Sequence, residues 1–286
     1  MSNIMFKTGK QNIGSKLINL ASGGDTLKAT LLNMSTAAGK IALISSSTNA
    51  SPIVVTTTGT HGFSNGDIVV IGGHLVNTAS NQTCKVAGVT SNTFQITTLL
   101  DGVNSTGNGV GATTGWCIDI TTAAVLGDVS ANTNGTDATL ASQTLTGDVF
   151  NAAAWTFTGL TATQVNAMAL YDNTASNDLF AFIDGRLQIY VVTQAVATNT
   201  SIAVQRLAAI IPNGTVVVFS NGQSATLTAQ ANVGDTSLTV SSLGGTVTRQ
   251  ATADVYTSGV GIPMTPGAGG ALQVTPDAGV NKVLVI

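Results

Sequence analysis

The stretch that decides the fold runs from residue 215 to residue 240 and has the sequence TVVVFSNGQSATLTAQANVGDTSLTV. It contains three short runs rich in Val, Thr and Leu, and the gaps between the runs carry the turn residues Asn, Gly and Asp. β-Branched residues favour strands, and Asn-Gly pairs favour tight hairpin turns. The stretch therefore predicts an all-β meander with strands at residues 215–220, 225–229 and 237–240.

The composition extends this prediction to the whole chain. Charged residues make up only 8% of the 286 residues, and Glu is absent, whereas an average soluble domain is roughly 25% charged. Glu and Lys are the usual helix-forming residues of exposed surfaces, so their scarcity argues against a helical protein. We predict a mainly β fold with one short N-terminal helix at residues 7–19, where Ile13, Leu17 and Ile18 have helical spacing.

Further strands are predicted wherever apolar and β-branched runs are bounded by turn residues, at 27–33, 53–58, 67–71, 85–89, 93–98, 165–171, 179–183, 272–275 and 282–286. The polar run at 45–51 has the composition of a domain junction. The Gly-, Asn- and Thr-rich segment 101–115 predicts a flexible connection. No fixed period of the kind that marks a solenoid or a propeller is evident.

Charge and hydropathy exclude several classes of partner. The formal net charge is −3 and the pI is about 5.0, so the basic surface that nucleic-acid binding requires is missing. Neither a signal peptide nor a run of 18 apolar residues is found, which predicts folding in a cytoplasm and no membrane partner. Two cysteines, Cys84 and Cys117, are too few for a disulfide framework, and we expect free buried thiols.

A metal site is not predicted. His61, His74 and Asp67 are the only candidate ligands that lie close together in the sequence, and His61 stands among glycines as a turn residue would. Asp172 and Asp178, which bound a polar hairpin loop, could hold Ca²⁺, but Asp is also an ordinary turn residue. We favour the turn interpretation in both places.

Nucleophilic and cofactor motifs are equally weak. Neither cysteine stands in a motif that would lower its pKa. Ser224 lacks the following glycine of a nucleophile elbow, because Thr226 occupies that position. The Gly-rich residues 107–111 lack the Lys and the following helix of a phosphate loop. We therefore predict no catalytic, cofactor-binding or metal-binding residues, no cofactor and no enzymatic activity.

Four short blocks carry a resemblance to a known kind of domain. Residues 49–56, 60–69, 77–79 and 92–96 resemble a small β domain that is common in structural proteins of tailed bacteriophages. Relatives place an aromatic residue where this chain has Cys84. This departure implies a weaker packing contact at that position and leaves the resemblance in place.

A second, discontinuous set of blocks resembles a family of phage virion proteins whose members begin with a short helix and a strand. The blocks are residues 7–32, 145–150, 155–157, 167–172, 179–184, 263–266, 272–274 and 278–284. In relatives the block at 179–184 runs almost directly into the closing blocks. Here residues 186–260 intervene, and their segments 211–215 and 234–240 resemble another β unit of phage surface proteins.

These resemblances imply a division of the chain. A β-sandwich-like, virion-attachment body would be formed by residues 1–45, 116–185 and 260–286, and it would carry two inserted small all-β domains at 46–115 and 186–259. Insertions of this kind are tolerated at exposed loops where the two chain ends lie close together.

The resemblances also imply a function. We expect a non-enzymatic structural protein of the virion, assembled in the host cytoplasm, most consistent with a capsid decoration (cement) protein that contacts the major capsid protein or other virion proteins. A tail or head fibre (adhesin) is one alternative, and a carbohydrate-binding surface module is another, although two Trp and three Tyr give little material for an aromatic platform. With so few charges to cover its exterior, the chain is expected to form a homo-oligomer.

Overall fold

The computed structural model describes residues 3–6, 25–74, 77–99, 102–107, 111–112, 115–146, 149–174, 176–184, 186–207, 211, 213–219, 221, 223–232, 234–249, 251–256, 265–274 and 284–285. Within these residues the regular structure consists of strands and of the short 3₁₀ turns η1 (Thr78–Ser80), η2 (Leu126–Asp128) and η3 (Ser130–Asn132). The chain is mainly β, as predicted. The helix predicted at residues 7–19 lies outside the described residues, and no helix of the described part is long and apolar enough to cross a membrane.

The chain divides into two compact units. The body unit consists of Ser2–Lys40, Ile120–Gly185 and Gly261–Ile286, and the other unit consists, Met1 aside, of Ile41–Asp119 and Arg186–Val260. This second unit contains two hydrophobic clusters, one in each segment. We call Ile41–Asp119 the barrel and residues 186–256 the repeat module, and describe each part by itself. The predicted division into a body and two inserts stays a prediction.

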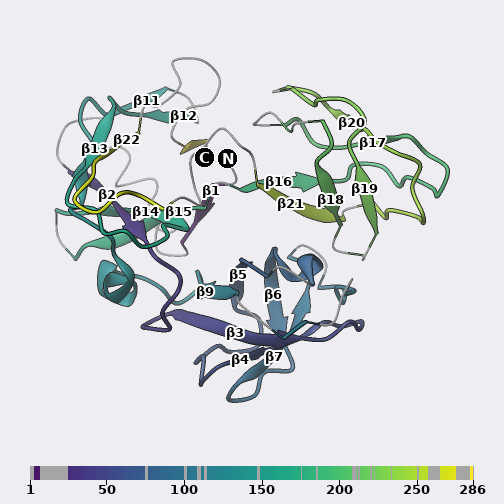
Figure 1. Ribbon diagram of the computed structural model, residues 1–286, viewed down its shortest axis with the longest axis horizontal. Coiled ribbons are helices and arrows are strands. Elements are labelled where there is room, and N and C mark those ends of the chain that lie inside the picture. Colours follow the sequence, from purple (N-terminus) through teal and green to yellow (C-terminus); the bar gives the residue numbers. More distant parts are fainter. Residues whose placement is uncertain are drawn as a thin grey trace. The chain divides into compact units, whose positions relative to one another are not determined.

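The barrel is formed by six strands that close on themselves (Figure 1). The order starts from β3 (Ile41–Ser47) and continues through β9 (Trp116–Asp119), β5 (Ile68–Gly72), β6 (Thr83–Ala87), β7 (Thr93–Thr97) and β4 (Val54–Thr57). β4 then pairs with β3, with Val55 opposite Ser47, and the short β8 (Gly111–Ala112) also pairs with β3. Closure leaves the six strands no free edge along the ring.

The described residues bear on two expectations about this part, its limits and the segment 101–115. Residues 45–47 of the predicted junction lie inside β3, and the barrel strands begin at Ile41 and end at Asp119, outside the predicted limits 46 and 115. Ser105, in the predicted flexible connection, is buried: the Ile53 N–H donates to its carbonyl (2.9 Å), and its own N–H donates to the carbonyl of Ile96 (3.1 Å). Composition could not show this, because the backbone supplies both bonds.

The body unit is organised around a five-stranded antiparallel sheet. Its strands, in spatial order, are β1 (Asn3–Met5), β15 (Asp178–Ile183), β14 (Ala167–Asp172), β2 (Leu27–Leu32) and β10 (Ala138–Thr139). Every residue of β14 is buried, which means that both faces of the sheet are covered at its centre, as a sandwich-like body requires.

Smaller sheets complete the body unit. β12 (Val149–Asn151) pairs with β11 (Thr144–Thr146) and with β23 (Leu284–Val285), and β13 (Trp155–Phe157) pairs with β22 (Leu272–Val274). Trp155 and Phe157 are buried and Thr156 is exposed, the alternation of a strand with one face toward the core. One partner of β12 and the partner of β13 therefore come from the last part of the chain.

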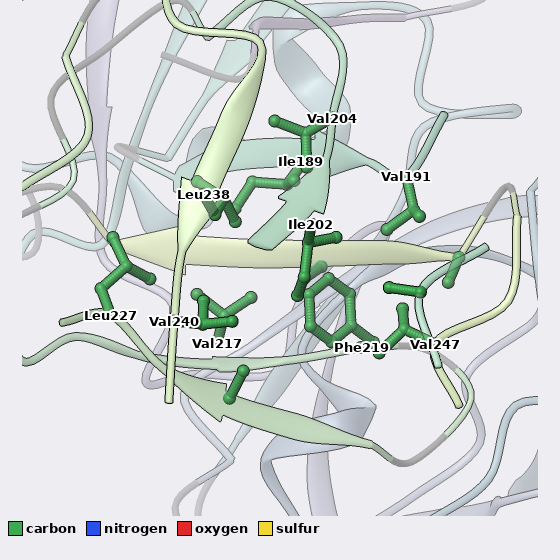
Figure 2. Close-up of a cluster of buried hydrophobic side chains, with 14 of the residues drawn as sticks. Ile189, Val191, Ile202, Val204, Val217, Phe219, Leu227, Leu238, Val240 and Val247 are labelled. Atoms are coloured by element: carbon green, nitrogen blue, oxygen red, sulfur yellow. The ribbon is translucent and has the colours of Figure 1, made fainter. Parts of the chain in front are cut away.

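The repeat module has a nested topology. Its strands are β16 (Arg186–Tyr190), β17 (Ser201–Ala203), β18 (Val216–Val218), β19 (Ser224–Thr226), β20 (Ser237–Thr239) and β21 (Thr252–Tyr256), paired as β18–β19, β17–β20 and β16–β21. The predicted meander is confirmed in part: β18 pairs with β19, and the bridge Leu227–Val240 joins segment 225–229 to segment 237–240, but the main partner of β20 is β17. The side chains drawn in Figure 2 converge on one interior.

The module is an internal duplication that the sequence analysis did not find. Residues 36 positions apart in the chain have equivalent pairing partners. The bridge Val191–Val204 in the first half corresponds to Leu227–Val240 in the second. The bridge Ala195–Val247, which joins the halves, corresponds to Ala231–Ile211, in which each half supplies the other partner. Ile202 and Leu238 are equivalent positions of the two halves, and they lie opposite each other in the β17–β20 pair. The two halves are thus related by an approximate two-fold axis that passes between β17 and β20.

We predict that the barrel can be removed without unfolding the body unit. The chain enters and leaves the barrel on paired antiparallel strands, with Ile41 opposite Ile118, so the two ends lie only about 5 Å apart. Replacing residues 41–119 by a short Gly/Ser linker should leave a cooperative thermal transition and a β-type circular dichroism spectrum.

The matched control is a deletion of residues 46–115 only. It retains most of β3 and all of β9, whose apolar residues Ile44, Trp116 and Ile118 would lose the barrel core around them, and we expect this variant to aggregate. A deletion of 41–119 that abolishes cooperative unfolding would show that the barrel is integral to the body, contrary to the prediction.

Candidate functional site

One buried cluster in the barrel brings a histidine to a hydroxyl group. Ser47, at the end of β3, and His74, just after β5, lie with Oγ and Nε2 2.8 Å apart. Asn77 donates to the same Oγ through its side-chain Nδ2 (2.9 Å) and to His74 Nδ1 through its backbone N–H (3.2 Å). This Ser–His–Asn arrangement is the most site-like constellation in the described part of the chain.

Local backbone geometry places His74 in this cluster. Gly72 ends β5 against the indole ring of Trp116, and a Cβ at this position would lie 2.4 Å from a ring carbon. Gly73 then has a φ of +73°, a conformation that glycine adopts without steric cost. Asn81 holds the following residue at both backbone groups, because its side chain accepts from the His74 N–H (2.9 Å) and donates to the His74 carbonyl (2.7 Å).

The protonation pattern of the cluster is the wrong one for catalysis. Because Nδ1 of His74 accepts the Asn77 N–H, the proton of the neutral ring belongs on Nε2, and Nε2–H donates to Ser47 Oγ. A general base needs the opposite arrangement, with an unprotonated Nε2 that takes the serine proton. His74 is only 1% exposed, and burial lowers its pKa, which keeps the ring neutral at pH 7. The cluster is therefore suited to holding the segment 74–80 against β3.

The other histidine also belongs to the barrel core. His61 stacks on Phe63 with ring centroids 4.5 Å apart and meets Phe94 edge-on at 5.5 Å. Its Nδ1 accepts the N–H of Phe63 (3.0 Å), and Asp67 accepts the N–H of Ser64 (2.7 Å). The turn interpretation of His61 is thus incomplete, since the ring is a packed core residue. Among the described residues no cluster of three or more His, Cys or Asp side chains could hold a metal ion.

Both cysteines are free and buried, as predicted. The thiol of Cys84 donates to the carbonyl of Val69 (3.5 Å) and that of Cys117 to the carbonyl of Ala42 (3.5 Å). Burial raises the pKa of Cys117, so its reactive thiolate form is suppressed.

The remaining candidates occupy turns and close approaches. Asp172 is buried and its carboxylate accepts the N–H of Thr174 (2.8 Å), which is the Asx turn expected of a hairpin loop. Gly107 packs against the backbone of residues 48 and 49, and a Cβ there would lie 2.8 Å from the carbonyl oxygen of Thr48. This close approach accounts for the glycine without a phosphate ligand. Ser224 lies exposed in β19.

Sequence reasoning missed the partners of His74. Ser47 and Asn77 are 30 residues apart in the chain, and neither belongs to a recognisable motif. Only the pairing of the barrel strands brings them together. No family model and no curated protein matches this chain.

We predict that Ser47→Ala destabilises the barrel by about 2–3 kcal/mol, because the buried Nε2–H of His74 loses its acceptor, while Asn77 Nδ2 keeps its bond to the Thr48 carbonyl (2.9 Å). The matched control is Ser45→Ala in the same strand, where the half-buried hydroxyl only donates to the Thr56 carbonyl (3.1 Å), and about 1 kcal/mol is expected. Denaturant unfolding of both variants measures the difference, and equal effects would contradict the special role of Ser47.

A second prediction concerns pH. Burial lowers the pKa of both His61 and His74, so the unfolded chain binds these protons at a higher pH than the folded chain does. Stability is then fully present above the unfolded pKa of about 6.5, and it falls as the pH is lowered from 7.5 toward the depressed folded values. Melting temperatures across pH 7.5 to 5 should decrease in the wild type and decrease less in His74→Gln, while an identical slope in this variant would remove His74 from the explanation.

Proposed function

We propose that this chain is a non-enzymatic structural protein of a tailed-phage virion, specifically a decoration protein of the head shell. The observation that carries the proposal is how the virion-like blocks pair. The blocks at 155–157 and 272–274 form β13 and β22, with Phe157 opposite Leu272 across more than 100 residues of chain. The blocks at 167–172 and 179–184 form the central strands β14 and β15, next to β2. Segments that resemble one family therefore form sheets with one another.

The use of polar side chains supports a framework role. Ser47, His74 and Asn77 satisfy one another inside the barrel. In the body unit the buried side chain of Asn134 bonds to the segment at 161–163, accepting the Thr161 N–H (2.8 Å) and donating to the Thr163 hydroxyl (3.1 Å). Such bonds fix loops to strands, which suits a rigid protein that packs against copies of itself and against the shell.

The carbohydrate-binding alternative finds no support in the two tryptophans or in Tyr171. Binding modules of that kind present exposed aromatic rings to the sugar. Here Trp116, Trp155 and Tyr171 are all buried, and the Tyr171 hydroxyl donates to Asp137 (2.6 Å). The fibre alternative differs from decoration in the location of the protein on the particle, so location is the decisive measurement.

Immunogold electron microscopy of purified particles of the encoding phage should label the head shell, and mass spectrometry of the same particles should detect many copies of the chain. The control is labelling of particles from an unrelated phage with the same antibody. Gold confined to the tail would replace decoration by the fibre role. Absence of the chain from purified particles would overturn the virion proposal altogether.

A further inference from the structure

The repeat module consists of two halves that scarcely pair within themselves. We call residues 186–219 half A and residues 222–255 half B. The three strand pairs β16–β21, β17–β20 and β18–β19 all join half A to half B. Within a half, the described pairing is one bridge, Val191–Val204 in half A and Leu227–Val240 in half B. Neither half can satisfy its strands alone.

Backbone hydrogen bonds between the halves repeat the two-fold relation. The N–H of Val204 donates to the carbonyl of Thr236, and 36 residues later the N–H of Val240 donates to the carbonyl of Thr200, both at 2.9 Å. The side chains follow the same rule, because the buried cluster draws equally on the two halves (Figure 2). The half-to-half contact therefore has the character of an isologous dimer interface.

The loop that connects the halves is not what specifies their pairing. β18 and β19 are joined by the short segment 219–223, whereas β16 and β21, which make the symmetry-equivalent pair, have no such connection and are the two ends of the module. The β16–β21 pair nevertheless forms the same ladder as β18–β19. Gln188 lies opposite Asp254 in β16–β21, and the equivalent residues Ser224 and Val218 lie opposite each other in β18–β19. Pairing without a connecting turn is thus already present in the structure.

Side-chain size makes the interface selective for unlike halves. Ile189 of half A lies opposite Ala253 of half B, and the equivalent pair is Val217 opposite Ala225. In both pairs half A supplies the large residue and half B the small one. Two A halves would set large residues against each other, and two B halves would leave space between alanines, each of which destabilises a core.

We propose that the repeat module is a fused dimer whose half-to-half interface is a complete recognition surface, so that half A binds half B of a second copy of this chain as well as its own. The proposal rests on the module alone and not on where the protein functions. It assigns residues 186–256 an interaction with a defined partner, the complementary half of a like molecule.

The test is complementation in trans between two full-length variants. Ile202→Asp disables half A and Leu238→Asp disables half B, because each places a charge at a buried position next to the axis. Refolded together, the two variants should form a mixed dimer with one intact module, built from half A of the Leu238→Asp chain and half B of the Ile202→Asp chain. Hydrogen exchange is the readout, since it reports the Val204 and Val240 amides directly and is unaffected by association through other surfaces.

With one partner isotopically labelled, the Val204 amide of the Leu238→Asp chain and the Val240 amide of the Ile202→Asp chain should regain protection only in the mixture. The matched control is a mixture of Leu238→Asp with Val240→Asp, in which both chains carry a defective half B and no complementation is possible. Protection in the control, or none in the complementary mixture, overturns the proposal.

Three further variants keep the test decisive if the charged variants aggregate. Cutting the wild-type chain at a protease site inserted into segment 219–223 should leave the Val204 and Val240 amides protected, as it leaves the barrel amide of Gly66, which donates to the Val86 carbonyl. Loss of module protection alone would overturn the proposal. Ala253→Ile should lower protection of the cut module by about tenfold, and adding Ile189→Ala should restore most of it.

Discussion

Strand β3 pairs with β9 along its first half and with β4 along its second, and this double pairing closes the barrel. The same dependence on distant strand partners holds in the other parts. β13 pairs with β22, and β16 pairs with β21, and in both cases more than 60 residues of chain separate the two strands. Because the described residues contain no helix longer than one 3₁₀ turn, local hydrogen bonding contributes little. Each part is stable only when its remote strands have met, which is costly in loop entropy but cooperative once formed.

The shortage of charged residues follows the same logic. Buried backbone groups at strand ends and in loops need partners, and this chain supplies them with short polar side chains. Asn132 donates to the carbonyls of Asn33 and Thr36, and Asn134 bonds the segment at 161–163. An amide carries both donors and an acceptor without the desolvation cost of an ion. The histidine and serine side chains of the barrel have the same role. His74 lies in a cluster of hydrogen bonds with Ser47 and Asn77 that fixes a loop.

Strand positions could be predicted from the sequence, whereas strand partners could not. The segments 27–33, 93–98 and 179–183 lie within one residue of the observed β2, β7 and β15, because alternation and turn residues are local signals. Barrel closure, the nested pairing of the module and the Ser47–His74 contact depend on which strands meet, and no local pattern encodes this. The 36-residue repeat occurs only twice, and its identical residues, such as Thr200 and Thr236 or Val204 and Val240, are scattered among substitutions such as Ile202 and Leu238.

The barrel and the repeat module each begin and end on a pair of antiparallel strands. In the barrel the first and last strands pair, with Ile41 opposite Ile118, and in the module Arg186 lies opposite Tyr256. Antiparallel partners are about 5 Å apart, so the chain returns to the point from which it departed. A host sheet interrupted at such a point needs little adjustment, because the gap it must bridge is the width of a strand pair. This geometry explains how β13 and β22 of the body unit can pair although the whole module separates them in the sequence, and it requires that the module hold its own ends together, which the β16–β21 ladder does.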